Sequence, residues 1–243
     1  MGGIFFTLLT QPMYNALIWL YSVLPGNDLG VAIILLTVII KLILWPFTGQ
    51  SLKSQTAMQQ LQPKIEEVKE KYKNDKEGQA KAMMALYKEE KVNPFSSCLP
   101  LLVQLPILLA LYNVLRRSVT DPEMLQALYG FVPAPEAIHT VFIGLVDLAT
   151  RSIPLAVLAG VVQYAQVKMI QVKTPAKGLA KKEGARDEAM MASMTKSMTY
   201  MMPILTVVFG MTLPSGVMLY WLVSGLVSVL QQWLVMRRRA ATV

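Results

Sequence analysis

The chain has 243 residues and a net charge of +8; 54% of its residues are hydrophobic and only 16% are charged. A soluble domain of this size cannot bury so much apolar surface, so the composition indicates an integral membrane protein. The basic residues form clusters between the apolar runs, and this arrangement is typical of charge that fixes membrane topology rather than charge that binds nucleic acid. The single cysteine, Cys98, and the single histidine, His139, argue against disulfides, metal sites and triad catalysis, and we predict no catalytic residue, no metal and no cofactor.

The first 27 residues carry no charged side chain. Two interpretations of residues 1–28 remain open: an amphipathic helix lying in the outer membrane interface, or an extra transmembrane helix that starts inside. Polar side chains near one face favour the interfacial helix, and the absence of a basic n-region argues against a conventional signal peptide. The polar residues are Thr7, Gln11, Asn15 and Ser22.

Residues 29–48 form the first predicted transmembrane helix, because about 20 residues at a rise of about 1.5 Å match a hydrocarbon thickness of roughly 30 Å. Lys41 puts an ammonium group inside this otherwise apolar run. A charge at the bilayer centre costs roughly 2.5 to 3.5 kcal/mol on insertion scales. Two interpretations are open: the side chain extends to the cytoplasmic headgroups about 10 Å away, or it faces a hydrated groove between helices.

Residues 51–92 form a charged insertion with nine lysines and seven acidic residues, which indicates a cytoplasmic segment. Its apolar residues recur at steps of three and four on both sides of NDKEG (residues 74–78), and this predicts a two-helix coiled-coil hairpin. We expect Pro63 either to kink the first arm or to begin a new helix. The apolar residues are Met58, Leu61, Ile65, Val68 and Tyr72 in the first arm and Ala80, Met83 and Tyr87 in the second.

The rest of the chain alternates apolar spans with charged connections. The last uncharged stretch is long enough for two spans, which the sequence LPSG (residues 213–216) separates. We predict transmembrane helices over residues 98–116, 152–170, 197–213 and 215–236, an exterior loop over 117–151, a flexible basic loop over 171–196 and a basic tail over 237–243.

The distribution of lysine and arginine predicts the topology. Nine lie in the hairpin, three from residue 116 to residue 151, seven from residue 168 to residue 196 and three in the tail. By the positive-inside rule the hairpin, the basic loop and the C-terminus are cytoplasmic. The predicted fold is therefore an all-α integral membrane protein with a five-transmembrane-helix core, a cytoplasmic coiled-coil hairpin and an N-terminal interfacial helix.

Uncharged polar side chains stand in the other spans. Facing lipid they would lose hydrogen bonds, so they either bond neighbouring helices or line a hydrated concavity. Together with Lys41, and with Thr37 one helical turn earlier, they favour a polar groove. They are Gln104, Gln163, Gln166, Ser224 and Ser228.

Four segments occur in order over residues 29–236: LTVIIKLILWPFT, MQQLQPKIEEVKEKY, MMALYKEEKVNPFSSCLPLLVQLPILLALY and MPILTVVFGMTLPSGVMLYWLVSGLVSVLQQWL. Together they resemble the YidC/Oxa/Alb family of membrane protein insertases. The resemblance implies a five-helix core around a positively charged groove that is open to the cytoplasm and to lipid and sealed outside. The chain departs from the family's pattern in having lysine where relatives often have arginine, no large exterior domain, and a tail too short for a ribosome-binding extension.

The resemblance also implies roles for individual residues. Lys41 matches the basic residue of the groove, Thr37 the threonine one turn before it, and Trp221 an aromatic residue that contacts the nascent segment. Polar groove positions are matched by Gln104, Gln163 and Ser224. For contact with clients or the ribosome we expect hairpin residues Met58, Met83, Met84, Lys69, Lys71 and Lys73.

The implied function is that of a membrane protein insertase and chaperone, not an enzyme, in the bacterial inner membrane. Its expected partners are nascent membrane proteins and lipids, with the Sec translocon and the ribosome as further candidates, and no direct recognition of nucleic acid. The alternative is a small-solute transporter or channel that uses Lys41 as an anion site, although no inverted repeat is evident. A membrane enzyme would need an acid–base pair that the spans lack.

Overall fold

The structure is a computed structural model that describes residues 3–93, 99–116, 121–170 and 200–240. Helices form nearly all of the regular structure in these ranges, and a short antiparallel ribbon forms the rest. The elements are η1 (Phe6–Thr10), α1 (Gln11–Val23), α2 (Leu29–Ile43), α3 (Trp45–Gln60), α4 (Gln62–Lys71), α5 (Lys76–Glu89), α6 (Leu99–Arg116), α7 (Pro122–Leu125), β1 (Val141–Phe142), β2 (Val146–Asp147), α8 (Ile153–Ile170), an unlabelled helix (Tyr200–Gly210) and α10 (Ser215–Ala240).

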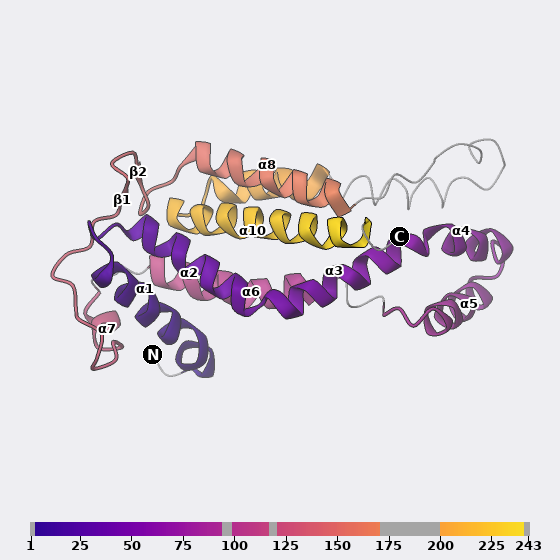
Figure 1. The fold of residues 1–243 in the computed structure, drawn as a ribbon, viewed down its shortest axis with the longest axis horizontal. Coiled ribbons are helices and arrows are strands. Elements are labelled where there is room, and N and C mark those ends of the chain that lie inside the picture. Colours follow the sequence, from indigo (N-terminus) through magenta and orange to yellow (C-terminus); the bar gives the residue numbers. More distant parts are fainter. Residues whose placement is uncertain (1–2, 94–98, 117–120, 171–199, 241–243) are drawn as a thin grey trace.

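Helix α10 is the central element of the membrane half, because it packs against α2, α3, α6 and α8 (Figure 1). Its segment Ser215–Arg237 is long and apolar enough to cross a bilayer by itself. Helices α2 and α3 meet the same criterion only as a bent pair, and three shorter helices are also apolar. These features agree with an all-α membrane protein. The predicted basic loop over residues 171–196 and Cys98 lie outside the described residues.

The predicted span over residues 29–48 is built from two helices that meet at 64° near Leu44. Pro46 stands in the first turn of α3, where its missing N–H leaves no helical hydrogen bond unmade. From α10, the Gln231 amide donates to the Trp45 carbonyl at 3.0 Å, and the Gln231 carbonyl oxygen lies 2.9 Å from the Thr48 hydroxyl. The bend is therefore anchored by a side chain of the central helix.

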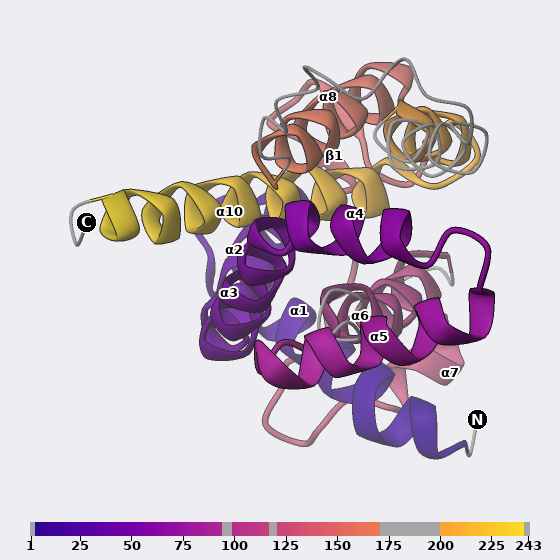
Figure 2. The ribbon, with the colours of Figure 1, turned by 90° about the vertical axis from the view of Figure 1, so that its right-hand side faces the viewer.

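Helices α4 and α5 pack side by side at the end of the molecule opposite α1, α7 and the ribbon (Figures 1 and 2). Pro63 lies in the first turn of α4, so it begins a new helix after α3 ends. The Asp75 carboxylate caps α5 by accepting from the Gly78 N–H at 2.9 Å. An ion pair between Lys64 of α4 and Glu90, the residue after α5, joins the start of the first helix to the end of the second. The hydrogen bond to the Glu90 carboxylate raises the pKa of Lys64.

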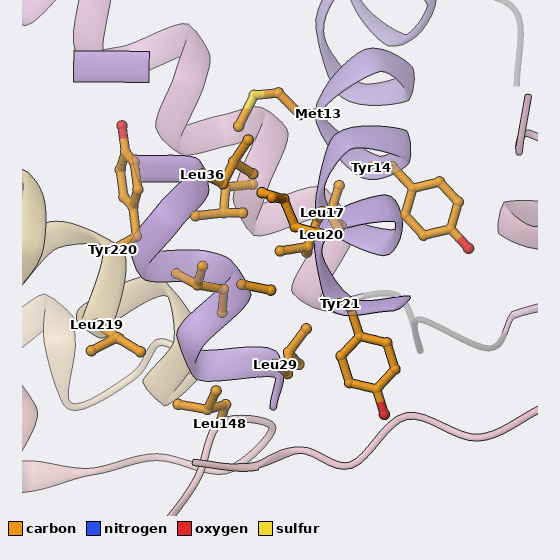
Figure 3. Close-up of a cluster of buried hydrophobic side chains, with 14 of the residues drawn as sticks. Met13, Tyr14, Leu17, Leu20, Tyr21, Leu29, Leu36, Leu148, Leu219 and Tyr220 are labelled. Atoms are coloured by element: carbon orange, nitrogen blue, oxygen red, sulfur yellow. The ribbon is translucent and has the colours of Figure 1, made fainter. Parts of the chain in front are cut away.

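Helix α1 is packed between α2 and the segment after α6. Leu17 and Leu20 point from α1 toward Leu36 of α2, whereas Tyr14 and Tyr21 point away from α2 (Figure 3). On that other side the Tyr21 hydroxyl accepts from the His139 N–H at 3.0 Å. The N-terminal helix is thus part of the main apolar core.

The polar side chains of the N-terminal helix do not all face water. Asn15 is buried; its amide donates to the Ala127 carbonyl at 3.0 Å and its carbonyl oxygen accepts from the Tyr129 N–H at 2.6 Å. Gln11 donates to the same Ala127 carbonyl at 3.0 Å. Two of the four residues that favoured an interfacial helix therefore bind the predicted exterior loop. The interfacial position of residues 1–28 stays a prediction.

The ribbon β1–β2 packs on the first turn of α2. Asp28 caps α2 by accepting from the N–H groups of Gly30 and Val31, and its second carboxylate oxygen accepts from the Ile143 N–H at 2.8 Å. The Phe142 ring lies directly over Gly30, where a Cβ atom would overlap it. This close approach requires glycine and fixes the ribbon to the end of the first predicted span.

We predict that Gly30→Ala lowers the free energy of unfolding by roughly 1–3 kcal/mol, because the added methyl group displaces Phe142. Denaturant unfolding of the purified protein in detergent measures the change. Gly130→Ala is the matched control, since no atom lies within 4 Å of a Cβ there. Combining Gly30→Ala with Phe142→Ala should recover part of the loss. Equal stability of the Gly30→Ala and Gly130→Ala variants would contradict the packing described.

Candidate functional site

The lysine of the first predicted span is held by side chains from two other helices. Lys41 lies near the C-terminal end of α2 and is partly buried. Its Nζ donates to the Ser228 Oγ of α10 at 3.1 Å and to the Gln104 Oε1 of α6 at 3.5 Å. A serine hydroxyl and a glutamine amide carry no charge, so both of these partners of the ammonium group are neutral. The cluster therefore keeps a net positive charge while Lys41 is protonated.

A chain of hydrogen bonds extends this cluster along α10. The Gln104 amide donates to the Tyr220 hydroxyl at 2.6 Å, and the Ser228 hydroxyl donates to the Ser224 carbonyl at 2.9 Å. Tyr220 and Ser224 are buried. Residues 220, 224 and 228 follow one another at intervals of one helical turn, so they share one face of α10. We call Lys41, Gln104, Tyr220, Ser224 and Ser228 the lysine cluster.

A second polar cluster lies where α8, the helix Tyr200–Gly210 and α10 meet. The Gln163 Oε1 of α8 accepts from the Trp221 Nε1 of α10 at 3.0 Å and lies 2.9 Å from the Thr206 hydroxyl. One side-chain oxygen thus joins three helices, as polar side chains commonly do inside membranes. We call Gln163, Thr206 and Trp221 the glutamine cluster.

Close packing of α8 on α10 accompanies the glutamine cluster. A Cβ atom on Gly225 would lie 2.8 Å from Val162, so the two helices approach at a distance that a larger residue would prevent. Small residues at such crossings allow backbones to come together in a bilayer. Trp221 stands one helical turn before Gly225 on α10, so both lie on the face that packs against α8.

The residues predicted for one groove form two hydrogen-bonded clusters. Lys41, Gln104 and Ser224 belong to the lysine cluster, whereas Gln163 and Trp221 belong to the glutamine cluster. Trp221 and Ser224 are three residues apart on α10, so this helix carries parts of both clusters.

Thr37 behaves differently from the other predicted groove residues. It is 1% exposed, and its hydroxyl donates to the Ile33 carbonyl of its own helix at 2.6 Å. Its matched role in the groove stays a prediction. The sequence interpretation missed Tyr220 and Thr206; the one available signal was that Tyr220 stands one turn before Ser224.

The predicted client-contact residues of the hairpin differ in exposure. Met84 is 53% exposed, whereas Met58 and Met83 are partly buried. Lys71 and Lys73 are exposed and Lys69 is partly buried. The hairpin therefore presents at least one methionine and two ammonium groups to solvent.

The described side chains offer hydrogen bonds and positive charge rather than a metal site. No group of three or more His, Cys, Asp or Glu side chains in the described part of the chain could hold a metal ion. An ammonium group with neutral partners attracts anionic or strongly polar groups, and this attraction is large where apolar helices lower the dielectric constant. The lysine cluster thus has the charge and the hydrogen-bonding groups that the predicted binding of acidic or polar chain segments would need.

Comparison with known proteins gives consistent matches. The family model described as "60Kd inner membrane protein" matches residues 19–242. A protein named "Membrane protein insertase YidC" from Syntrophobacter fumaroxidans is 36% identical over 236 residues, which cover 96% of this chain and 38% of that protein. A protein of the same name from Fusobacterium nucleatum is 38% identical over 214 residues, which cover 88% of this chain and 89% of that protein.

A solved structure is also similar. It is titled "Active YidC insertase crystal structure with the first transmembrane domain resolved" and matches with a TM-score of 0.58 and 26% identity. The match covers 94% of this chain and 46% of the solved chain. The chain therefore spans less than half the length of some relatives and most of the length of others.

We predict that Gln163→Leu lowers the free energy of unfolding by about 0.5–1.5 kcal/mol, because the Trp221 indole N–H loses its acceptor in a partly buried setting between helices. Denaturant unfolding in detergent measures the loss. Gln166→Leu is the control. Gln166 lies three residues further along the same helix, and its side chain makes no hydrogen bond within the described residues. Similar losses for both variants would show that the glutamine cluster contributes no specific stability.

Proposed function

We propose that this chain, which belongs to the family of the 60Kd inner membrane protein and the YidC insertases, moves nascent hydrophobic segments from the cytoplasm into the bilayer. The observation that carries the proposal is the lysine cluster. Lys41 places an amine among apolar helices with neutral hydrogen-bond partners, although an apolar residue there would avoid the insertion cost of a charge. Ionisable residues within membrane spans commonly mark functional sites, and insertion of polar flanking segments would use this positive charge.

The topology we propose has five transmembrane segments. The first is the bent α2–α3 pair, followed by α6, α8, the segment that ends in the helix Tyr200–Gly210, and α10. The α4–α5 hairpin then lies in the cytoplasm as a coiled coil, and the C-terminus lies there too. Nine lysines in residues 51–92 and three arginines after residue 236 support this orientation.

In the proposed mechanism, the hydrophilic flank of a client enters a hydrated groove from the cytoplasm. Lys41 attracts acidic and polar groups of the flank, while Gln104 and Ser228 hold the amine in place when the groove is empty. A hydrated groove shortens the apolar distance that the flank must cross. Burial of about 20 apolar client residues in hydrocarbon supplies the driving free energy, so no nucleotide is required.

The apolar helix of the client would leave toward lipid between α2, α8 and α10. Helix α10 packs against both other helices, so a client between them would contact its side chains. Exposed apolar residues continue this route to the lipid: Ile39 and Leu42 on α2, and Leu226 and Leu230 on α10. Trp221, which is bonded to Gln163 in the structure, would contact the client along the way.

The hairpin would make the first contact with clients. Met84 is exposed, and its flexible thioether side chain adapts to apolar segments of different shape. Lys71 and Lys73 add exposed positive charge to the hairpin, which suits the acidic flanks of clients. The ribosome and the Sec translocon are proposed as further partners on the same basis.

We predict that Lys41→Ala slows insertion of a client with an acidic translocated tail by about tenfold, whereas Lys41→Arg keeps most of the rate because the charge is retained. Insertion into proteoliposomes, followed by protection of the tail from protease, measures the rate. Lys53→Ala, which removes an exposed lysine of α3, is the control. Equal rates for all three variants would reject the electrostatic step.

We predict that replacing Met83 and Met84 together by serine lowers capture of the client by roughly fivefold, because apolar contact area is lost. Photo-crosslinking from the neighbouring exposed position Ala85 measures capture. Met211→Ser changes an exposed methionine at the opposite end and is the control. Undiminished crosslinking in the double variant would leave the hairpin as a structural spacer.

A further inference from the structure

Two arginines line one cavity at the end of the molecule that carries the β1–β2 ribbon. Arg116 is in the last turn of α6, and Arg151 precedes α8 by two residues. The cavity has a volume of about 290 Å³. Its lining includes both arginines and Tyr112, Ala149, Thr212 and Pro214.

The two guanidinium groups bring uncompensated positive charge to this cavity. Among the described residues, neither has a carboxylate oxygen within 4 Å. The nearest acid along the chain, Asp147, uses a carboxylate oxygen to accept from the Ala149 N–H at 3.0 Å. Both side chains are exposed. Arg116 lies over the Tyr112 ring at 5.9 Å and is favoured by the dipole of α6, whereas no ring contact of Arg151 is found in the described part of the chain. Two exposed cations at one cavity provide the charge that an anionic ligand would need.

Exposed apolar stripes lead along two helices to the same cavity. On α6, Leu102, Leu105 and Leu109 are 62%, 42% and 52% exposed, and they stand at helical spacing before Tyr112 and Arg116. A second stripe runs toward Thr212 along the helix Tyr200–Gly210. Its members are Met201, Leu205 and Val208.

We propose that this cavity binds the headgroup phosphate of an anionic phospholipid, with the acyl chains lying along the two apolar stripes. The planar guanidinium fork matches phosphate oxygens, and paired arginines hold a phosphodiester more strongly than one. A free anion would use the arginines but not the stripes, and an acidic peptide would need hydrogen-bonding groups along its backbone that the stripes lack. In the proposed topology, on which this inference rests, the lipid belongs to the outer leaflet.

The test is lipid binding to the full chain in detergent, measured by native mass spectrometry with phosphatidylglycerol. The double variant Arg116→Gln with Arg151→Gln should lower retention of one phosphatidylglycerol by about tenfold, and the double lysine variant should recover part of it. Arg237→Gln, which changes an arginine stacked on Trp233 at the other end of α10, should leave retention unchanged. Circular dichroism checks that each variant keeps its helices.

Three competitors separate the possible ligands. Inorganic phosphate at millimolar concentration should not displace the lipid, and displacement would indicate a free-anion site instead. Phosphatidylcholine, which carries no net charge, and an acidic peptide are the other two competitors. If the acidic peptide displaces phosphatidylglycerol more strongly than phosphatidylcholine does, the site binds a protein ligand and the lipid proposal is wrong. Retention that is equal in the wild type and the glutamine variant would overturn the proposal. Because client insertion can be measured on the same variants, failure of lipid binding is distinguishable from failure of the insertase function.

Discussion

The constraint on which the membrane half depends is the satisfaction of polar groups among apolar helices. A lysine ammonium in such a setting must find oxygen atoms, and here it finds Ser228 Oγ at 3.1 Å and Gln104 Oε1 at 3.5 Å. These bonds connect α2, α6 and α10. Since neither partner carries a charge, the contacts orient the amine without neutralising it, and in the proposed mechanism it would attract an anionic segment of the client.

Helix α10 distributes this constraint through the bundle. Its Ser228 accepts from Lys41 of α2, and its Gln231 donates to the Trp45 carbonyl at the α2–α3 bend. Nearer its N-terminal end, Trp221 donates to Gln163 of α8. Polar bonds between membrane helices are individually modest, about 0.6 kcal/mol on average, so helix contacts that rest on them can be exchanged for contacts with a client. A bundle that must open toward lipid benefits from such exchangeable contacts, and this links the packing to the proposed insertase function.

Local sequence patterns predicted the features that depend on neighbouring residues. A break at Pro63 was accessible, although the sequence left open whether it is a kink or a new helix. The expectation that Lys41 and Gln104 lie near one another was accessible too, because the cost of a charge in an apolar span needs no knowledge of the fold. Thr37 and Asn15 were not, because their surroundings depend on packing. The Thr37 hydroxyl is satisfied by its own helix, and Asn15 bonds to backbone groups more than 110 residues away. Helical periodicity identifies a polar face but not the segment that will cover it.

Water access to position 41 tests the central claim most directly. In a Cys98→Ser background, Lys41→Cys and Ile39→Cys would each be labelled with a membrane-impermeant maleimide added to the cytoplasmic side of sealed vesicles. Ile39 is 43% exposed on the same helix and would face lipid. The account predicts rapid labelling at position 41 and little at position 39. Equally slow labelling at both positions would contradict it, because the lysine would then lie in a dry interface with no groove for a client to enter.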